Sequence, residues 1–273
     1  EQIIRRYGLS FNEGRGVLLI DITDFSLFSS FEQASQLNSL SYSLNSAYSK
    51  LAGCGVEINF ARTTTGDGYY VWNRDTHPNA DRDLFLLLLL VLADNSLARA
   101  ASRGNTVPVI RSAFHIGSHY ELYQAEGVNP TVFSYIVGDV TIELARILEK
   151  SLPGQVMLGD FGSQQGDEQC SADFVRTCAE AAGGLGGLQF MGRPLRDLRC
   201  WLSRDSADTT EEGQPLDVSI TDKHGLEHHA FNMQAEFVFE DDTLVIGLTP
   251  EQFGNAEAAV AQGGEATSGG WWV

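Results

Sequence analysis

The sequence predicts an α+β fold in which helices pack on a mixed sheet, and three observations support this class. Strand-like and helix-like segments alternate in the order βαββαββαβ over residues 17–158, which is typical of an α/β sandwich with a mixed sheet. The apolar run at residues 17–20 is typical of a central strand that is covered on both faces. With 273 residues, 43 % of them hydrophobic, the chain can form one large core.

The remaining elements of this core follow from their patterns. Runs rich in β-forming residues predict further strands at 56–60, 68–72, 107–116, 132–137 and 155–158. Helical spacing of apolar residues predicts helices at 26–51, 81–102 and 138–150. Polar composition predicts a lead-in segment at 1–15 and a loop at 120–130.

The leucine-rich run at residues 84–93 is only about half as long as a membrane-spanning helix must be. We therefore expect a fully buried helix and no membrane span. No secretory signal is visible, and none of the four cysteines forms a Cys-x-x-Cys pair, which favours free thiols in the cytoplasm. The net charge of −18 argues against nucleic acid as a partner, although bound cations would still permit a small anionic ligand.

The pattern weakens after residue 158. Strand-like runs at 195–202, 216–221, 228–239 and 243–248 follow, and the last three predict a small C-terminal β-meander. We expect a main domain at 1–205, a β-rich appendage at 206–250 and a flexible tail at 251–273. His224, His228 and His229 have no accompanying ligand pattern, so we expect them on a hairpin surface.

Two aspartates stand where strand-like runs end or turn. Asp21 follows the apolar run at 17–20, and Asp67 lies in the glycine turn between two β-rich runs. Taken separately, each has an ordinary explanation: Asp21 as an acid at the start of a helix, and Asp67 as part of a hairpin turn. If the strands are neighbours, both carboxylates reach one sheet edge, where they and the carbonyl of Ile22 can hold Mg²⁺ against phosphate. Backbone N–H groups of residues 22–26 can then face the phosphate oxygens.

Four segments in this order resemble the class III nucleotidyl cyclases. Residues 21–26 resemble the first metal-binding motif of that family, and residues 65–69 resemble the second. Residues 111–117 are similar to the strand before the substrate loop, and residues 138–147 are similar to the dimer-interface helix. The match spans about residues 15–160 and implies a ferredoxin-like cyclase domain.

The resemblance also implies a mechanism and its parts. Two Mg²⁺ or Mn²⁺ ions would be bound at Asp21, Ile22 and Asp67 during cyclisation of a nucleoside triphosphate. The implied nucleotide-binding residues of the first motif are Thr23, Asp24, Phe25 and Ser26. In the family, active sites lie at the interface of a homodimer, and the second subunit supplies a transition-state Asn and Arg. The arginine position falls on Arg146, whereas the asparagine position falls on Ile142, which cannot hydrogen-bond through its side chain.

Two further positions bear on the base. In the family, Lys three residues before the glycine of the second motif selects adenine and Glu selects guanine; here that residue is Thr63. Its partner position, often Asp, Thr or Cys, is Tyr135. Tyrosine fills volume that a purine needs, so we hypothesise a pyrimidine triphosphate, with UTP favoured over CTP. The chain is similar in these respects to the bacterial pyrimidine cyclases of Pycsar antiphage systems.

Two alternatives remain open. If Tyr135 packs in the core, the substrate would be ATP and the protein an adenylate cyclase. Alternatively, the absence of the family asparagine at Ile142 is what we expect of an inactive cyclase homology domain that binds nucleotide or mediates dimerisation.

Overall fold

The computed structural model describes residues 8–125, 132–161, 170–203, 215–222 and 225–252. Its helices are α2 (Ser30–Gly53), α3 (Ala80–Ala101), α4 (Asp139–Lys150) and α5 (Cys170–Ala182), with single 3₁₀ turns at Phe25–Leu27 and Gly183–Leu185. Its strands are β1 (Gly8–Ile22), β2 (Phe60–Thr64), β3 (Gly68–Asn73), β4 (Ile110–Ala125), β5 (Val132–Val137), β6 (Val156–Gly159), β7 (Gln189–Phe190), β8 (Arg193–Pro194), β9 (Asp197–Leu202), β10 (Asp217–Thr221), β11 (Glu227–Val238) and β12 (Thr243–Ile246).

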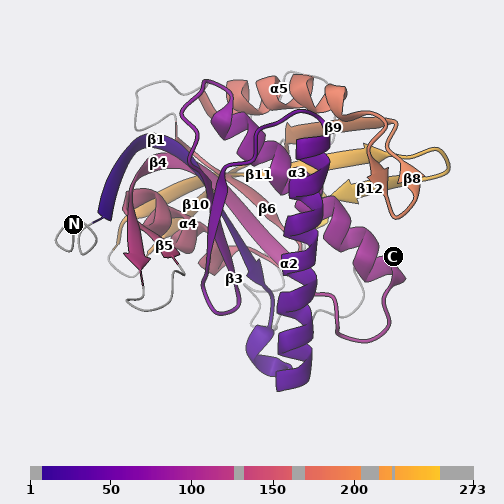
Figure 1. The fold of residues 1–273 in the computed structure, drawn as a ribbon, viewed down its shortest axis with the longest axis horizontal. Helices are drawn as coiled ribbons and strands as arrows, with labels where there is room; N and C mark the ends of the chain where they lie inside the picture. The colour runs from indigo at the N-terminus through magenta and orange to yellow at the C-terminus, as the bar shows by residue number, and fades with distance from the viewer. Residues whose placement is uncertain (1–7, 126–131, 162–169, 204–214, 223–224, 253–273) are drawn as a thin grey trace.

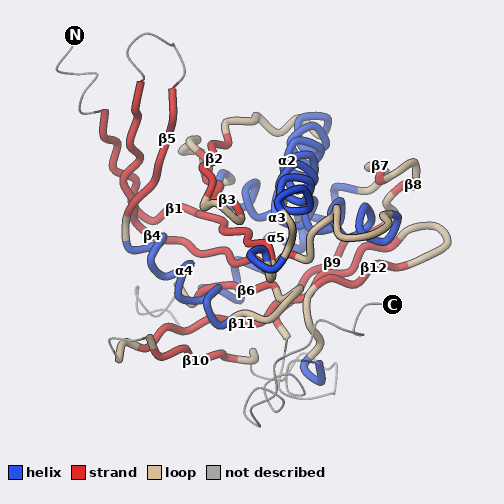
Figure 2. Tube along the Cα trace, turned by 90° about the horizontal axis from the view of Figure 1, so that it is seen from below, coloured by secondary structure: helices blue, strands red, loops and turns tan. Residues whose placement is uncertain are grey.

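One ten-stranded sheet organises the molecule. Its main order is β10-β11-β6-β4-β1-β3-β2, while β5 pairs with β4, and both β9 and β12 pair with β11. The pairing of β4 with β6 is parallel and the other strand pairs are antiparallel, so the predicted mixed sheet and α+β class are confirmed. Helices α2, α3 and α5 cover one face of the sheet and α4 covers the other (Figures 1 and 2).

Helix α3 forms the centre of the larger core. Its residues from 84 to 93 are all buried, and Phe85 packs edge-on against Phe114 of β4 and Phe174 of α5. By length and composition α3 could cross a membrane, but 67 % of its most apolar window is buried inside the protein. The structure thus confirms the buried helix that the sequence predicts.

The strands near the N-terminus are longer than we predicted. β1 begins at Gly8, in the expected lead-in segment, and β4 continues to Ala125, through part of the expected loop at 120–130. These strand ends show no core pattern in the sequence because they form a wing whose aromatic side chains, including Phe11 and Tyr120, are exposed. β2 is also displaced from the predicted 56–60, because Phe60 rather than Val56 begins the pairing, opposite Asn73.

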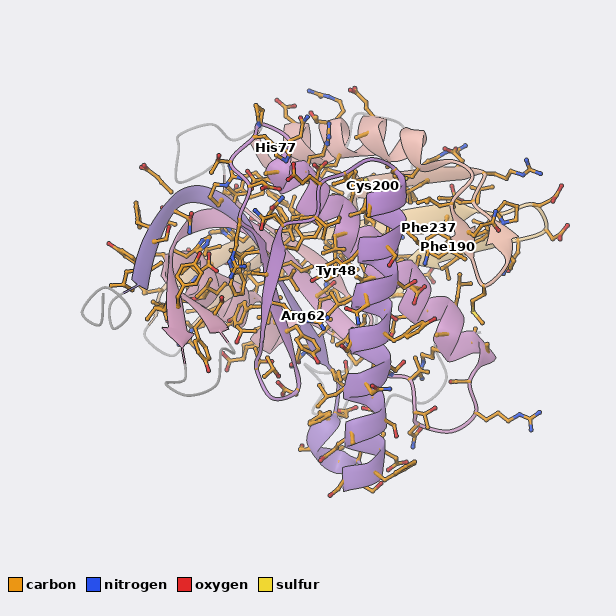
Figure 3. All side chains as sticks on the ribbon, in the orientation of Figure 1. Tyr48, Arg62, His77, Phe190, Cys200 and Phe237 are labelled. Atoms are coloured by element: carbon orange, nitrogen blue, oxygen red, sulfur yellow. The ribbon has the colours of Figure 1, made fainter. Side chains whose placement is uncertain are left out.

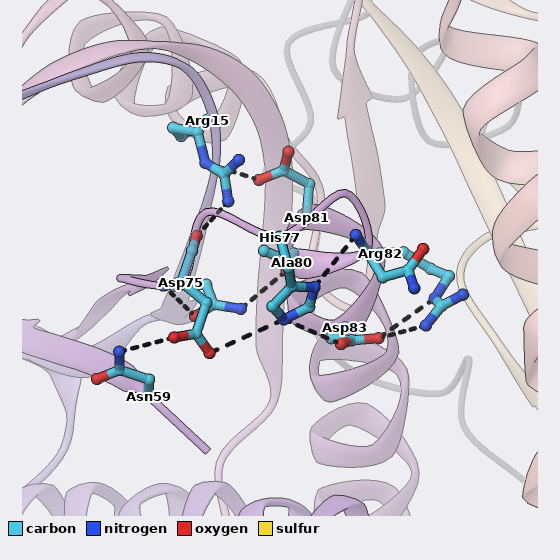
Figure 4. Close-up of polar contacts among 10 residues, drawn as sticks. Arg15, Asn59, Asp75, His77, Ala80, Asp81, Arg82 and Asp83 are labelled. Carbon is cyan, nitrogen blue, oxygen red and sulfur yellow. Dashed lines mark hydrogen bonds and ion pairs between the residues drawn. The ribbon is translucent and has the colours of Figure 1, made fainter. Parts of the chain in front are cut away.

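A β-bulge sets the direction of this wing. The register of β1 against β4 shifts between Asn12 and Arg15. The backbone N–H of Gly16 donates to Asp81 Oδ1 at 2.8 Å, and Arg15 donates to the carbonyl of Asp75. These contacts tie the bulge to the loop and first turn of α3 (Figure 4). The wing therefore bends so that β5 approaches β2.

The C-terminal strands are part of the same sheet. β10, β11 and β12 form the predicted antiparallel meander, and β11 also pairs with β6 and with β9. Hydrogen-bonded pairs therefore link the strands on either side of the boundary expected after residue 205. The division into 1–205, 206–250 and 251–273 stays a prediction, since the linker at 206–214 and most of the tail lie outside the described residues.

Candidate active site

Asp21 and Asp67 lie side by side at one end of the sheet. Asp21, at the end of β1, stands opposite Gly68 at the start of β3, and the N–H of Ile22 donates to the carbonyl of Asp67 at 2.9 Å. A Cβ atom on Gly68 would lie 1.9 Å from the carbonyl oxygen of Ile20, so only glycine permits this approach. The close hairpin brings together the two carboxylates that the sequence singled out.

The charge balance of this pair suits a cation. Burial raises the pKa of Asp21, and the neighbouring carboxylate of Asp67 raises it further. Arg111 opposes this, because its Nε donates to Asp21 Oδ2 at 2.8 Å, but the net pKa of Asp21 stays above its usual value. One arginine therefore does not satisfy two adjacent acids. This donor set of hard oxygens fits Mg²⁺ or Mn²⁺ completed by phosphate and water.

The site is a two-carboxylate site in the part of the chain that is described. No group of three or more His, Cys, Asp and Glu side chains suited to a metal ion occurs there. Ile22 is buried, and the N–H groups of Ile22 and Thr23 bond to Asp67 and Val109 within the protein. Those two amides therefore do not face phosphate, contrary to our expectation for residues 22–26.

The turn after β1 leaves other groups for an anion. Asp24 adopts a left-handed conformation, and Phe25 and Ser26 follow in the 3₁₀ turn. Thr23 Oγ1 is buried and has no hydrogen-bond partner among the described residues.

Helix α2 begins at Ser30 rather than at the predicted residue 26, because Ser29 forms a capping box with Glu32.

The two positions that we expect to contact the base, Thr63 and Tyr135, line one cavity of about 600 Å³. Thr63 comes from β2 and Tyr135 from β5. The other lining residues are Ala61, Arg62, Thr64, Tyr69, Arg74 and Ser134. Tyr135 is 44 % exposed and is therefore not a core residue. The ATP alternative assumed that Tyr135 packs in the core, so its starting assumption does not hold. The exposure does not itself identify the base.

Two arginines of this cavity were missed by sequence reasoning. Arg74 donates through Nε to buried Glu121 at 2.8 Å and through Nη2 to Ser134 Oγ at 2.6 Å. Arg62 lies over the ring of Tyr69 and donates to Ser41 of α2, the helix beside it in Figure 3. The sequence does contain a signal for them, because Arg62 and Arg74 are two cations in or next to the hairpin strands of a strongly acidic chain. Both cations line the cavity that Thr63 and Tyr135 also line.

Arg146 and Ile142 lie one helical turn apart on α4. Ile142 is 56 % exposed, so this face of the helix is open to solvent in the single chain. Arg146 Nη1 donates to Glu149 at 3.2 Å, and its described contacts include neither Asp21 nor Asp67. Tyr70 links the two regions, since its hydroxyl donates to the carbonyl of Thr141, and burial and the charge of Asp21 raise its pKa.

The histidines differ from their prediction in one case. His228 is buried, not on the surface, and contacts Glu143 of α4. His229 pairs with Asp217 in a more exposed position, as predicted, and His224 lies outside the described residues. Successive side chains of a strand point to opposite faces, so β11 buries one of two adjacent histidines and exposes the other. The sequence alone does not tell which of the two is buried.

Comparison with solved structures supports the cyclase fold. The catalytic core of a rhodopsin–guanylyl cyclase with converted specificity, in complex with ATPαS, matches with a TM-score of 0.50 and 14 % identity, over 82 % of this chain and 97 % of that one. The guanylate cyclase domain of RhGC from Catenaria anguillulae, in complex with GTP, gives the same values. The adenylyl cyclase CyaB from P. aeruginosa matches at a TM-score of 0.46 and 10 % identity, over 82 % and 95 % of the two chains.

No protein-family model and no curated protein sequence matches the chain. At 14 % identity, the likeness concerns the fold alone. The chain has the fold of class III nucleotidyl cyclase catalytic domains.

Proposed function

We propose that the protein is a nucleotidyl cyclase that converts a pyrimidine nucleoside triphosphate, UTP in preference to CTP, to the 3′,5′-cyclic monophosphate and pyrophosphate. The observation that carries this proposal is the juxtaposition of Asp21 and Asp67 at adjacent strand ends. In a cyclase fold, this pair stands at the sheet edge where the motif resemblance expects the metal ligands.

The residues around the pair have distinct tasks in this proposal. Asp21 and Asp67 hold two divalent cations, and Arg111 orients Asp21 through its 2.8 Å hydrogen bond. When bound, Mg²⁺ or Mn²⁺ lowers the pKa of the attacking ribose hydroxyl and neutralises the triphosphate. Residues 23–26 receive the phosphates. Arg146 is the catalytic cation, and the motif resemblance implies that a second copy of the chain supplies it. Its described contacts within one chain include neither aspartate.

The residues that line the cavity between β2 and β5 are the reason for proposing a pyrimidine base. Its volume of about 600 Å³ includes the space around Thr63 and Tyr135, whose hydroxyls can both donate and accept hydrogen bonds. In this proposal, the phenol ring of Tyr135 takes space that a two-ring base would need. The similarity to Pycsar cyclases extends the proposal to a cytoplasmic homodimer whose cyclic nucleotide acts as a second messenger in antiphage defence.

The direct test is incubation with each of ATP, GTP, CTP and UTP in the presence of Mg²⁺ or Mn²⁺, with product analysis by mass spectrometry. We expect cUMP as the main product and cCMP as the second. Dominant cAMP would refute the pyrimidine assignment and favour an adenylate cyclase. Exposed Ile142 favours the second candidate, an inactive homology domain, which would bind nucleotide but form no product from any of the four.

A further inference from the structure

A buried charge cluster joins α4 to the hairpin of β10 and β11. Figure 2 shows this hairpin, which belongs to the sheet, beside α4, the helix that covers the face opposite α3. His228 of β11 donates from Nδ1 to Glu143 Oε2 of α4 at 2.6 Å, since a carboxylate only accepts. Its second ring nitrogen lies 3.7 Å from Oδ2 of Asp222, which follows β10. Arg146 Nε of α4 lies 3.6 Å from the same oxygen.

Asp222 is the centre of this cluster. Its side chain is only 4 % exposed and that of His228 only 6 %. Arg146 Nε and His228 Nε2 are buried nitrogens that lack a hydrogen-bond partner among the described residues. Both approach Asp222 Oδ2, within a few tenths of an ångström of hydrogen-bond range. A buried carboxylate is tolerated where cations or donors surround it, and this cluster supplies both.

The hairpin turn fixes the direction of that carboxylate. Asp222 Oδ1 accepts a hydrogen bond from the N–H of Leu226 at 3.0 Å, and the backbone N–H of Asp222 donates to the carbonyl of Leu226 at 2.9 Å. One carboxylate oxygen is thus engaged within the hairpin, and the other lies 3.6 Å from Arg146 Nε of α4. The orientation is a property of the turn and does not depend on the flexibility of Arg146.

The cluster restricts the guanidinium of Arg146. Glu149 holds Nη1 at 3.2 Å from one side and Asp222 lies against Nε from the other. Two of the three guanidinium nitrogens therefore face carboxylates, of which that of Asp222 is buried and that of Glu149 is exposed. A long side chain that is ordered before the reaction loses less conformational entropy when it meets its ligand.

We propose that Asp222, supported by His228 and Glu143, positions Arg146 for the cyclisation reaction. The inference rests on the proposed function, in which Arg146 is the catalytic cation. It gives the β10–β11 hairpin, which the sequence suggested was an appendage, a role in catalysis through α4. Asp222, His228 and Glu143 are positioning residues, because they act through Arg146 and not on the substrate.

Asp222→Asn tests this arrangement with little change of shape. The amide oxygen can still accept from Leu226, while an uncharged NH₂ group replaces the oxygen that faces Arg146. We expect kcat to fall by about 10- to 100-fold, with KM for the nucleotide changed by less than about 3-fold. In an Arg146→Ala background, the same substitution should change kcat by less than about 2-fold, because the residue through which it acts is absent.

Asp217→Asn is the matched control. Asp217 belongs to the same hairpin and also pairs with a histidine, His229 at 3.1 Å, but on the exposed side. This variant should keep the wild-type kcat. Equal losses in both variants, or a wild-type kcat in Asp222→Asn, would overturn the proposal. Where Asp222→Asn does not fold, Glu143→Gln removes the support of His228 and should lower kcat by about 3- to 10-fold.

An NMR measurement tests the positioning without turnover. The Nε–Hε signal of Arg146, identified by its loss in Arg146→Lys, should be shifted from the free-arginine position in the wild type and return toward it in Asp222→Asn. An unchanged signal contradicts the inference. If the wild type forms no cyclic product, the proposed function fails, whereas this signal still shows whether Asp222 orders Arg146.

Discussion

At the scale of single residues, the acid pair at the strand ends explains both the expected chemistry and its pH dependence. The pKa of Asp21 is raised by burial and by Asp67, and lowered in part by Arg111. Because the folded-state pKa lies above the unfolded value, the charged form of Asp21 costs stability at higher pH. This cost is relieved as the pH falls through the folded pKa or as a cation binds.

Metal binding should therefore compete with a proton. We expect the affinity for Mn²⁺ to fall as the pH is lowered through the raised pKa of Asp21, because both bind the same carboxylate. Titration calorimetry at several pH values measures this dependence. Asp21→Asn should remove most of the binding. An Mn²⁺ affinity that does not change with pH would show that Asp21 is not a ligand.

Asp67→Asn separates stability from activity. The substitution removes a negative charge that raises the pKa of Asp21. The free energy of unfolding at neutral pH should therefore be unchanged or higher by less than about 1 kcal/mol. Product formation should nevertheless fall by about 100-fold or more. Scanning calorimetry and the nucleotide assay measure the two effects. A variant with lower stability and normal turnover would contradict both parts.

At the scale of elements, the β2–β3 hairpin places the second carboxylate. Its approach to β1 requires Gly68, since a Cβ atom there would meet the Ile20 carbonyl. Gly68→Ala should therefore lower the free energy of unfolding by about 2 kcal/mol or more and abolish metal binding. Gly53→Ala at the end of α2 meets open space and should be neutral or slightly stabilising. Urea denaturation compares the two variants.

The sequence predicts most elements but not their pairing partners. Glycines and apolar periodicity located α2, α3 and the hairpin, and the motif resemblance found Asp21, Asp67 and Arg146. The contacts of Arg111 with Asp21 and of His228 with Glu143 depend on strand register and on which face a residue occupies. Such contacts join residues 90 and 85 positions apart, and no local pattern reports them.

At the scale of the whole molecule, the proposed active site needs two chains. Arg146 is held near Asp222, and its described contacts do not include the acid pair of its own chain. We expect a mixture of Asp21→Asn and Arg146→Ala, each strongly impaired but measurable alone, to recover about a quarter of wild-type activity through mixed dimers. No recovery after subunit exchange, checked by native mass spectrometry, would show that one chain supplies both groups.

The all-round burial of α3 has a consequence for how the chain can be made. α5 contributes Val175 and Cys178 to the core around α3, and Phe174 stacks on the ring of Phe114. Yet α5 follows the last motif in sequence and leaves the ribosome well after α3. A fragment of residues 15–160 would carry every motif but lack this cover, so we expect it to aggregate more than the full chain when the two are expressed side by side. We therefore expect that the segment carrying the motifs does not fold as an independent unit.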